Sequence, residues 1–332
     1  MSRHTRIIRL VVCGVAATTL LLGLFYACRP KPSAARARIA VTIGTPLVAP
    51  VVYADAEHLW KEDGLEVELQ RLLLGRACLD AVLSGDADVA TVAETPLVLS
   101  AAAGLELEIL CAICSSDQHV HVAARSDHGV LTPRDLQGKL VATAVGTNNE
   151  YYLRQFLKHN GLDFGKIKLV NYNPAEMSRA LLGGVIDGAA FWNPYLDDCR
   201  AKLGEKLIVF PPGDYYTVYY CLVARKGFAA TNPTVADMLV RGLRRATDQM
   251  RALRVEAIPT IAAALPMQED LLQLIWDGYR FEVGFPDGLT EEMLRQASWV
   301  GETNPHGAEQ ARKAIPSLNA RVPELHKGQI LQ

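Results

Sequence analysis

Short apolar segments alternate with longer segments of helical periodicity along the chain from about Ile39 to Leu203. Short apolar runs bounded by turn residues are typical of buried strands, and apolar residues three or four positions apart are typical of helices. Strands and helices that alternate in this way build βα units, in which helices cover parallel sheets. The pattern therefore predicts an α/β protein.

The predicted elements form two successive sets. The strands of the first set are 38–43, 65–69, 88–92 and 107–113, with helices at 50–61, 76–83 and 96–103. The strands of the second set are 139–144, 166–170 and 186–192, with helices at 149–160, 174–182 and 194–203. After a strand near 220–223, helices are predicted at 232–251, 256–265, 268–283 and 290–301.

The two sets resemble each other, which indicates an internal repeat. Gly44-Thr45 after the first strand matches Gly146-Thr147 after its counterpart, and a glycine stands three residues before both Asp88 and Asp187. We interpret these aspartates as residues of turns and strand ends. Open α/β sheets bind ligands at the carboxyl ends of their strands. We therefore expect two such edges to face each other across a cleft.

Composition and charge fit two folded lobes and indicate no nucleic-acid partner. The 332 residues are half hydrophobic and 21% charged, and their formal net charge is −2. A chain of this length has room for two domains, each with its own core. It has no long basic segment, so it lacks the charge pattern of a DNA- or RNA-binding protein.

The first 28 residues predict export. Arg3, Arg6 and Arg9 precede an almost uncharged stretch that ends at Cys28, which is the pattern of a secretory signal. Ala27-Cys28 matches the lipoprotein signal, in which the cysteine is lipidated, and an uncleaved membrane anchor is the alternative. Residues 29–38 are predicted to be a polar tether. We therefore expect a membrane-anchored protein in the periplasm or at the cell surface.

Motifs of common enzymes and metal sites are missing from the sequence. It has no Gly-x-Ser-x-Gly elbow, no phosphate-binding Gly-Lys-Ser/Thr loop and no His-Glu-x-x-His zinc motif. We interpret His119 and His121 as half-exposed residues of one strand rather than metal ligands. Cys111-x-x-Cys114 ends an apolar strand, so these and the other cysteines after Cys28 are predicted to be buried thiols. We expect no cofactor, metal or catalytic residue.

Several segments taken in order resemble one family of binding proteins. They are Asp63-Gly64-Leu65-Glu66, Gly75, Ser84-Gly85-Asp86-Ala87-Asp88, Thr95-Pro96, Asp135-Leu136-Gln137-Gly138-Lys139, Gly146-Thr147, Gly183-Gly184-Val185-Ile186-Asp187-Gly188 and Trp192-Asn193-Pro194-Tyr195. Together they resemble the periplasmic solute-binding proteins of ABC transporters in the sulfonate, taurine, nitrate and thiamine-pyrimidine-precursor group. The resemblance covers about residues 39–224.

This resemblance implies a two-lobed periplasmic-binding-protein fold with a hinge between two parallel-type sheets. Lobe 1 is expected to comprise residues 39–124 and 219–332, and lobe 2 residues 125–218. The chain is expected to cross between the lobes near Arg125 and near 216–220, and these crossings form the predicted hinge. Members of the family bind a ligand between the lobes and deliver it to an ABC permease with its ATPase. We expect a monomer.

The resemblance also implies which residues bind the ligand. In lobe 1 they are Thr45, Pro46, Leu47, Gly75, Arg76, Glu94 and Thr95. In lobe 2 and the return crossing they are Thr147, Asn148, Asn149, Trp192, Asn193, Tyr195, Thr217 and Tyr219. The helix-start turns Gly75-Arg76 and Thr147-Asn148-Asn149 offer free N–H groups to an anionic or carbonyl group. The alternatives are that the Asn pair only caps its helix, that Arg76 is a surface charge and that Trp192 packs in the core.

Arg76 and the helix starts favour an anionic group on the ligand, whereas Glu94 favours an amine. The sequence therefore predicts an organic solute with polar ends, such as an aminosulfonate or a heterocycle, rather than nitrate or bicarbonate. The predicted function is the extracytoplasmic solute-binding component of an ABC importer. The alternatives are a ligand-sensing protein and an enzyme similar to the pyrimidine synthases of this fold, whose Cys-rich motif the sequence lacks.

Overall fold

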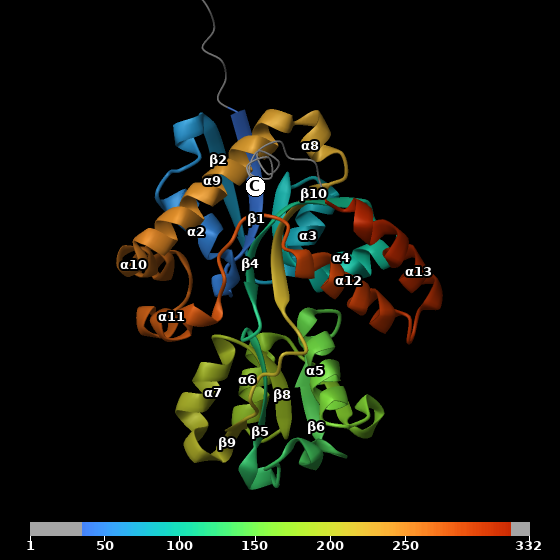
Figure 1. The fold of residues 1–332 in the computed structure, drawn as a ribbon. Coiled ribbons are helices and arrows are strands. Elements are labelled where there is room, and N and C mark those ends of the chain that lie inside the picture. Colours follow the sequence, from blue (N-terminus) through green and yellow to red (C-terminus); the bar gives the residue numbers. More distant parts are fainter. Residues whose placement is uncertain (1–34, 320–332) are drawn as a thin grey trace, which may run out of the picture. The chain divides into compact units, whose positions relative to one another are not determined.

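The computed structural model describes residues 35–319 (Figure 1). The predicted signal segment, Cys28 and residues 29–34 of the predicted tether lie outside this range. From Arg36 onward, the described residues belong to one compact unit. None of the helices within the described range is both long and apolar enough to cross a membrane.

The first sheet has five strands in the order β2-β1-β3-β10-β4. The strands are β1 Ala35–Thr42, β2 Leu65–Leu72, β3 Val89–Ala93, β4 Leu107–Ser116 and β10 Val218–Arg225. β1 runs parallel to β3, whereas β10 runs antiparallel to β3 and β4. The connecting helices are α2 Ala49–Ala56, α3 Gly75–Ser84 and α4 Glu94–Ala102.

The second sheet also has five strands, in the order β7-β6-β8-β5-β9. The strands are β5 Val120–Arg125, β6 Leu140–Thr143, β7 Lys168–Asn171, β8 Gly188–Trp192 and β9 Leu207–Val209. β6 runs parallel to β7 and β8, whereas β5 runs antiparallel to β8 and β9. The helices of this part are α5 Asn148–His159, α6 Pro174–Leu182 and α7 Tyr195–Leu203.

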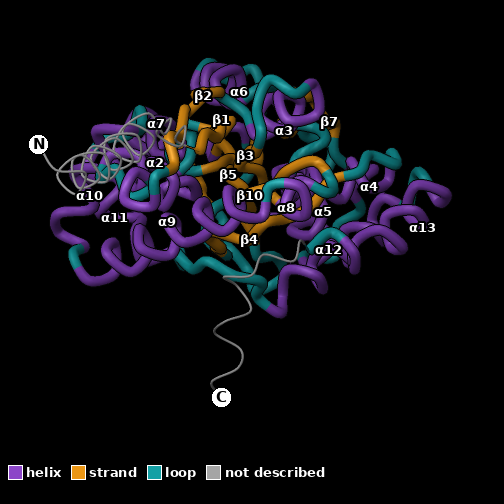
Figure 2. The backbone as a smooth tube through the Cα atoms, turned by 90° about the horizontal axis from the view of Figure 1, so that it is seen from above, coloured by secondary structure: helices purple, strands orange, loops and turns teal. Residues whose placement is uncertain are grey.

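The helices after β10 pack against the first sheet and its helices, and Figure 2 shows strands enclosed by helices. They are α8 Phe228–Thr231, α9 Pro233–Ala252, α10 Arg254–Ala264, α11 Glu269–Ile275, α12 Asp287–Val300 and α13 Pro305–Ala314. α9 and α10 contact α2, and α12 and α13 contact α4. Short 3-10 helices lie at Pro46–Val48, Lys61–Asp63, Ser126–His128, Pro133–Leu136, Phe164–Lys166, Gly204–Lys206, Trp276–Gly278 and Ile315–Ser317.

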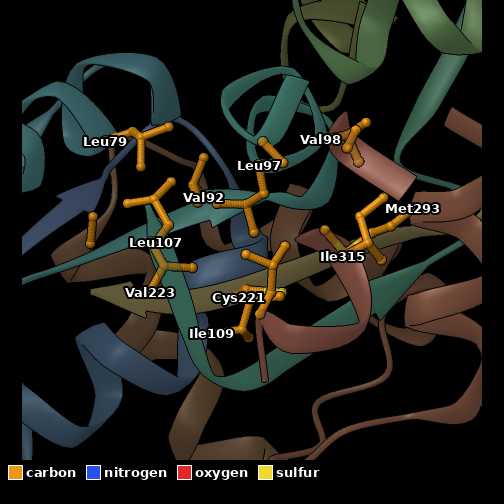
Figure 3. Close-up of a cluster of buried hydrophobic side chains, with 14 of the residues drawn as sticks. Leu79, Val92, Leu97, Val98, Leu107, Ile109, Cys221, Val223, Met293 and Ile315 are labelled. Atoms are coloured by element: carbon orange, nitrogen blue, oxygen red, sulfur yellow. The ribbon is translucent and has the colours of Figure 1, made fainter. Parts of the chain in front are cut away.

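A hydrophobic core joins α4 and α12 to the first sheet (Figure 3). Val92, Ile109 and Val223 come from β3, β4 and β10, and they pack with Leu97 of α4 and Met293 of α12. Each of these side chains is buried. Burial of a side chain of this size contributes about 1.5–3 kcal/mol. This core fixes the position of α4, whose first turn adjoins the candidate site.

The internal repeat in the sequence corresponds to an equivalent hydrogen bond in each sheet. Asp88 Oδ2 accepts the backbone N–H of Arg38 at 2.8 Å, and Asp187 Oδ2 accepts the N–H of Leu140 at 2.8 Å. In each sheet, a carboxylate just before one strand therefore binds the backbone of the neighbouring strand. These contacts confirm the interpretation of Asp88 and Asp187 as strand-end residues.

Both sheets are mixed, because each receives one strand from the opposite direction. β10 enters the first sheet after the chain has returned from the second, and it therefore starts where β1 and β3 end. β5 enters the second sheet in the same way, and it runs opposite to β8. Hydrophobic patterning gives the positions of strands but not their directions, so the mixed character was not predicted.

Sheet membership and edge pairing differ from the sequence prediction at two places. Lobe 1 was predicted to end near Arg125. This limit is wrong, because β5 pairs with β8 and β9 of the second sheet, and the chain therefore crosses between the sheets before Val120. The predicted helix 268–283 is also too long. α11 ends at Ile275, and the chain then pairs with the edge strand β4 through Ser115↔Arg280 and Ala112↔Gly284. β9, α8 and α13 were not predicted.

Candidate functional site

A cleft of about 440 Å³ lies between the two sheets, at the carboxyl ends of their parallel strands. Thr42 and Val92 reach it from the ends of β1 and β3, and Asn171 and Trp192 from the ends of β7 and β8. The volume is within the range of small-molecule sites. This is the arrangement predicted from the internal repeat, with one sheet edge on each side of the cleft.

Four helices begin at the cleft wall, namely α3, α5, α6 and α7, the last of them with Tyr195. Gly75, Asn148 and Pro174, the first residues of α3, α5 and α6, each line the cleft. α5 and α6 are capped by the side chains of Thr147 and Asn173, whereas α3 has no side-chain cap. The first turn of a helix carries unpaired N–H groups and the positive end of the helix dipole. These helix starts favour an anionic group in the cleft.

The first-sheet wall is closely packed around Gly75. The Tyr220 hydroxyl donates a 2.9 Å hydrogen bond to Thr42 Oγ1. A Cβ at Gly75 would lie 3.4 Å from Val92 and 3.5 Å from the Tyr220 hydroxyl. These are ordinary van der Waals distances, so the start of α3 lies directly beside β3 and β10, and its N–H groups are within reach of the cleft.

Tyr195 extends across the cleft to the first sheet. It is the first residue of α7 and belongs to the second-sheet side. A Cβ at Gly44 would lie 3.2 Å from the Tyr195 hydroxyl. The backbone at Gly44, just after β1, and the Tyr195 side chain from the other side of the cleft are therefore neighbours.

Charged side chains in the cleft wall are already paired. Arg76 is exposed, and its Nε donates to Asp80 Oδ1 at 3.0 Å within the same helix. Glu176 forms a capping box with Asn173, whose backbone N–H donates to Glu176 Oε2 at 2.9 Å. An exposed ion pair of this kind stabilises little and is open to water. The wall therefore offers an anion mainly neutral donors.

His119 lines the cleft although it is only 3% exposed. Its Nδ1 is 3.0 Å from the Tyr279 hydroxyl. Burial, and to a smaller extent His121, lowers the pKa of His119 to about 3. The interpretation of His119 as a half-exposed strand residue is therefore wrong. Its burial depends on Tyr279, which is 160 positions away and invisible to a local pattern.

Glu94 does not line the cleft, which corrects its predicted role as the partner of a ligand amine. The residue is fully buried at the start of α4. Its Oε1 accepts hydrogen bonds from the Tyr216 hydroxyl at 2.7 Å and from Gln296 Nε2 at 2.8 Å, and Oε2 accepts the Tyr219 N–H at 2.8 Å. Burial and the nearby carboxylate of Glu292 raise the pKa of Glu94 to about 7. Glu94 therefore belongs to an internal polar network.

The predicted ligand-binding residues divide into two groups. Those that line the cleft are Thr45, Leu47, Gly75, Arg76, Thr147, Asn148, Trp192 and Tyr195. Those outside its lining are Pro46, Glu94, Thr95, Asn149, Asn193, Thr217 and Tyr219.

Several residues outside the lining support it from behind. Asn149 is buried and donates to the Ala190 carbonyl at 2.9 Å. Asn193 donates to the Gln118 carbonyl at 3.4 Å. Tyr219 packs its hydroxyl against Gly288 of α12. Residues next to each other in sequence therefore have different roles, because successive positions of a turn point in different directions.

The part of the wall that follows β7 was not predicted from the sequence. Asn171, Tyr172, Asn173 and Pro174 all line the cleft. Asn173-Pro174 after a strand combines a capping residue with a proline at the first helical position, and this helix-start signal could have identified the loop. The five cysteines of the described range are buried thiols, as predicted. Residues 35–319 contain no group of three or more metal-binding side chains.

Comparison with solved structures identifies the class of fold. The alkanesulfonate-binding protein SsuA of Xanthomonas axonopodis pv. citri, bound to MOPS, has a TM-score of 0.71 at 17% identity, covering 88% of this chain and 99% of that one. The periplasmic aliphatic sulphonate binding protein SsuA of Escherichia coli has a TM-score of 0.69 at 20% identity, covering 82% and 88%. The fold is thus the two-lobed α/β fold of periplasmic binding proteins.

The chain belongs to the NMT1/THI5 like family, whose model matches residues 45–257. Among curated proteins, it is similar to the taurine-binding periplasmic protein of Escherichia coli (strain K12), with 29% identity over 147 residues. That alignment covers 44% of this chain and 45% of the relative, so it spans less than half of either protein.

Proposed function

We propose that this protein is the extracytoplasmic solute-binding component of an ABC importer and that it captures a small organic sulfonate. The observation that carries the proposal is the cleft between two sheets, with the starts of α3, α5 and α6 in its wall. The names of the similar proteins, which bind taurine or aliphatic sulfonates, support the ligand class. They also favour solute binding over the alternative of a pyrimidine-synthase-like enzyme.

The chemistry of the wall suits a sulfonate. Its three oxygens share one negative charge and accept several hydrogen bonds, which N–H groups at helix starts supply. The positive charge of Arg76 contributes little, because Asp80 pairs with it at the surface. Leu47, Val92 and Trp192 provide apolar surface for the carbon skeleton of the ligand.

Because Glu94 does not line the cleft, the proposed ligand differs from the aminosulfonate that the sequence predicted. The amine preference rested on that carboxylate, which is committed to Tyr216, Gln296 and the backbone of Tyr219. Glu176 is the remaining carboxylate of the lining, and its capping box engages it. We therefore propose an alkyl- or arylsulfonate in preference to an aminosulfonate.

The proposed setting of this activity includes an exported chain that is lipidated at Cys28. Such an anchor would hold the protein at the outer face of the cytoplasmic membrane, next to an ABC permease with its ATPase. We also propose that the protein is a monomer and that it binds its solute without converting it chemically. The basic N-terminal segment and its apolar stretch up to Cys28 support it.

Calorimetry with matched ligand pairs tests the proposed function. Butanesulfonate should bind more tightly than taurine, and pentanoate, nitrate, bicarbonate and a pyrimidine should bind weakly. At about 100 times its Kd, a ligand adds about 2.7 kcal/mol to the free energy of unfolding, so a thermal shift provides a second measurement. Tight binding of nitrate or a pyrimidine, with no response to any sulfonate, would overturn the proposal.

A further inference from the structure

Of the two ring nitrogens of His119, Nδ1 has a hydrogen-bond partner in the protein, and Nε2 is available to a ligand in the cleft. The residue stands directly before β5, lines the cleft and is 3% exposed. Its ring lies edge-on to Tyr279, with the ring centroids 5.9 Å apart, and Nδ1 is 3.0 Å from the Tyr279 hydroxyl. Nε2 has no hydrogen-bond partner within residues 35–319.

The hydrogen bonds of Tyr279 decide which nitrogen carries the proton. The Tyr279 hydroxyl has a hydrogen bond with His119 Nδ1 at 3.0 Å, whereas the Asn193 amide donates to the Gln118 carbonyl at 3.4 Å. The proton of the Tyr279 hydroxyl is then available to His119 Nδ1. Because Nδ1 accepts this proton, a neutral ring carries its own proton on Nε2.

The opposite arrangement is unfavourable. If His119 donated from Nδ1, the Tyr279 hydroxyl would have to direct its proton elsewhere. Within residues 35–319, the hydrogen bond of this hydroxyl is the one to His119 Nδ1. Tyr279 is buried, and an unsatisfied buried donor is costly.

We propose that His119 is a ligand-binding residue, which donates its Nε2–H to an anionic oxygen of the solute. The solute class, a sulfonate, rests on the proposed function. This contact would be neutral, unlike the ion pair expected from Arg76. It would act together with the N–H groups at the starts of α3, α5 and α6, so the anion would be held by donors that carry no formal charge.

The surroundings of the ring keep it neutral. Tyr279 and His121 are the titratable groups that face His119. Burial lowers the pKa values of both histidines and raises that of Tyr279, so none of the three is charged near neutral pH. Sulfonate oxygens also stay ionised across this range, and the contact should therefore be insensitive to pH between about 5 and 8.

Nuclear magnetic resonance of the ligand-free full chain, labelled with ¹⁵N-histidine, tests the protonation state directly. The signals that vanish in His119→Gln identify the residue. We expect protonated Nε2 and unprotonated Nδ1 in the wild type, and a mixture of tautomers in Tyr279→Phe. An Nδ1–H tautomer, or an imidazolium near neutral pH, overturns the inference whether or not any sulfonate binds.

Calorimetry with butanesulfonate tests the contact itself. His119→Leu should weaken binding roughly 10- to 100-fold, the range for a hydrogen bond to a charged group, and His119→Gln should recover part of this loss. Tyr279→Phe should cost roughly 2- to 10-fold, because the ring loses its neutral partner. His121→Leu is the matched control, since His121 follows two positions later and lies outside the cleft lining.

The outcomes separate this inference from the proposed function. If wild type binds butanesulfonate and a folded His119→Leu binds it equally well, the inference fails while the function stands. If wild type binds no sulfonate, the proposed function fails, and the tautomer of His119 still decides whether the residue presents a donor to the cleft. Circular dichroism and thermal unfolding establish that each variant is folded.

Discussion

The indole Nε1 of Trp192 donates a 3.2 Å hydrogen bond to Asn148 Oδ1, and both residues line the cleft. Trp192 ends β8, and Asn148 begins α5. The bond orients the indole ring against the wall and fixes the Asn148 amide. The pair therefore holds an apolar surface and a polar group side by side, as an organic anion requires.

Trp192→Phe tests this pair, because it removes the N–H and keeps an aromatic ring. We expect butanesulfonate affinity to fall by about 0.5–1.5 kcal/mol, the scale of one hydrogen bond, and Trp192→Ala to cost more through lost apolar contact. Calorimetry measures both. Trp299→Phe, outside the cleft lining, is the control. Equal affinity in wild type and Trp192→Ala would exclude Trp192 from the site.

Tyr216 should stabilise the protein through its bond to Glu94. The 2.7 Å bond joins a buried hydroxyl to a fully buried carboxyl group. Tyr216→Phe should lower the free energy of unfolding by about 1.5–3 kcal/mol. The neighbouring Tyr215 donates to the Tyr152 hydroxyl at 3.2 Å, a neutral contact, so Tyr215→Phe should cost less. Urea unfolding of both variants checks the difference, and equal losses would contradict it.

Glu94 should make the stability of the fold depend on pH. Its pKa in the folded state is raised to about 7, above the usual value of 4.5, mainly by burial. The folded protein then holds this proton more tightly than the unfolded chain. Its contribution to stability is therefore full below about pH 4.5 and is lost as pH rises through about 7, with a slope of at most about 1.4 kcal/mol per pH unit.

Glu94→Gln should remove this component of the pH dependence, because an amide does not titrate. Urea unfolding between pH 4.5 and 8 gives the measurement. Glu108→Gln is the control, since Glu108 is another buried carboxylate and accepts the N–H groups of Gly227 and Ala229 away from the cleft. An unchanged slope in Glu94→Gln would show that other groups cause it.

Ligand binding should bring the two sides of the cleft together. The chain crosses between the sheets at residues 117–119 and 210–217, between β4 and β5 and between β9 and β10. Two short crossings allow a hinge motion, and each side supplies only part of the wall. Small-angle scattering should show a smaller radius of gyration with saturating butanesulfonate. An unchanged radius in a sample that calorimetry shows to be liganded would contradict closure.

Cys28 should determine attachment to the membrane. If the lipid on this residue is the lasting anchor, Cys28→Ala abolishes lipidation and releases the protein after signal processing. Fractionation and metabolic labelling with palmitate measure these two effects. Cys13→Ala, within the same apolar stretch, is the matched control. Retention of Cys28→Ala in the membrane would instead favour an uncleaved N-terminal helix.

Local patterns predicted most of the strands and helices that build the cleft. The helical pattern placed α6 at its observed bounds, Pro174–Leu182. The repeat of Gly before Asp88 and Asp187 identified the two equivalent sheets, because the same turn and the same backbone hydrogen bond recur in each. The direction of β10 was not predictable in this way, since an apolar strand has the same pattern in either direction.

The sequence by itself determined the α/β class, the repeat, the resemblance to binding proteins and several of the turns that form the cleft. These properties depend on the order of neighbouring residues. The roles of Glu94 and His119 depended on the tertiary structure. Glu94 meets Gln296, 202 positions away, and His119 meets Tyr279, 160 positions away. Such distant partners determine burial and hydrogen bonding. As a result, Glu94, which was predicted to contact the ligand, is a core residue. His119, which was predicted to be a half-exposed strand residue, lines the cleft.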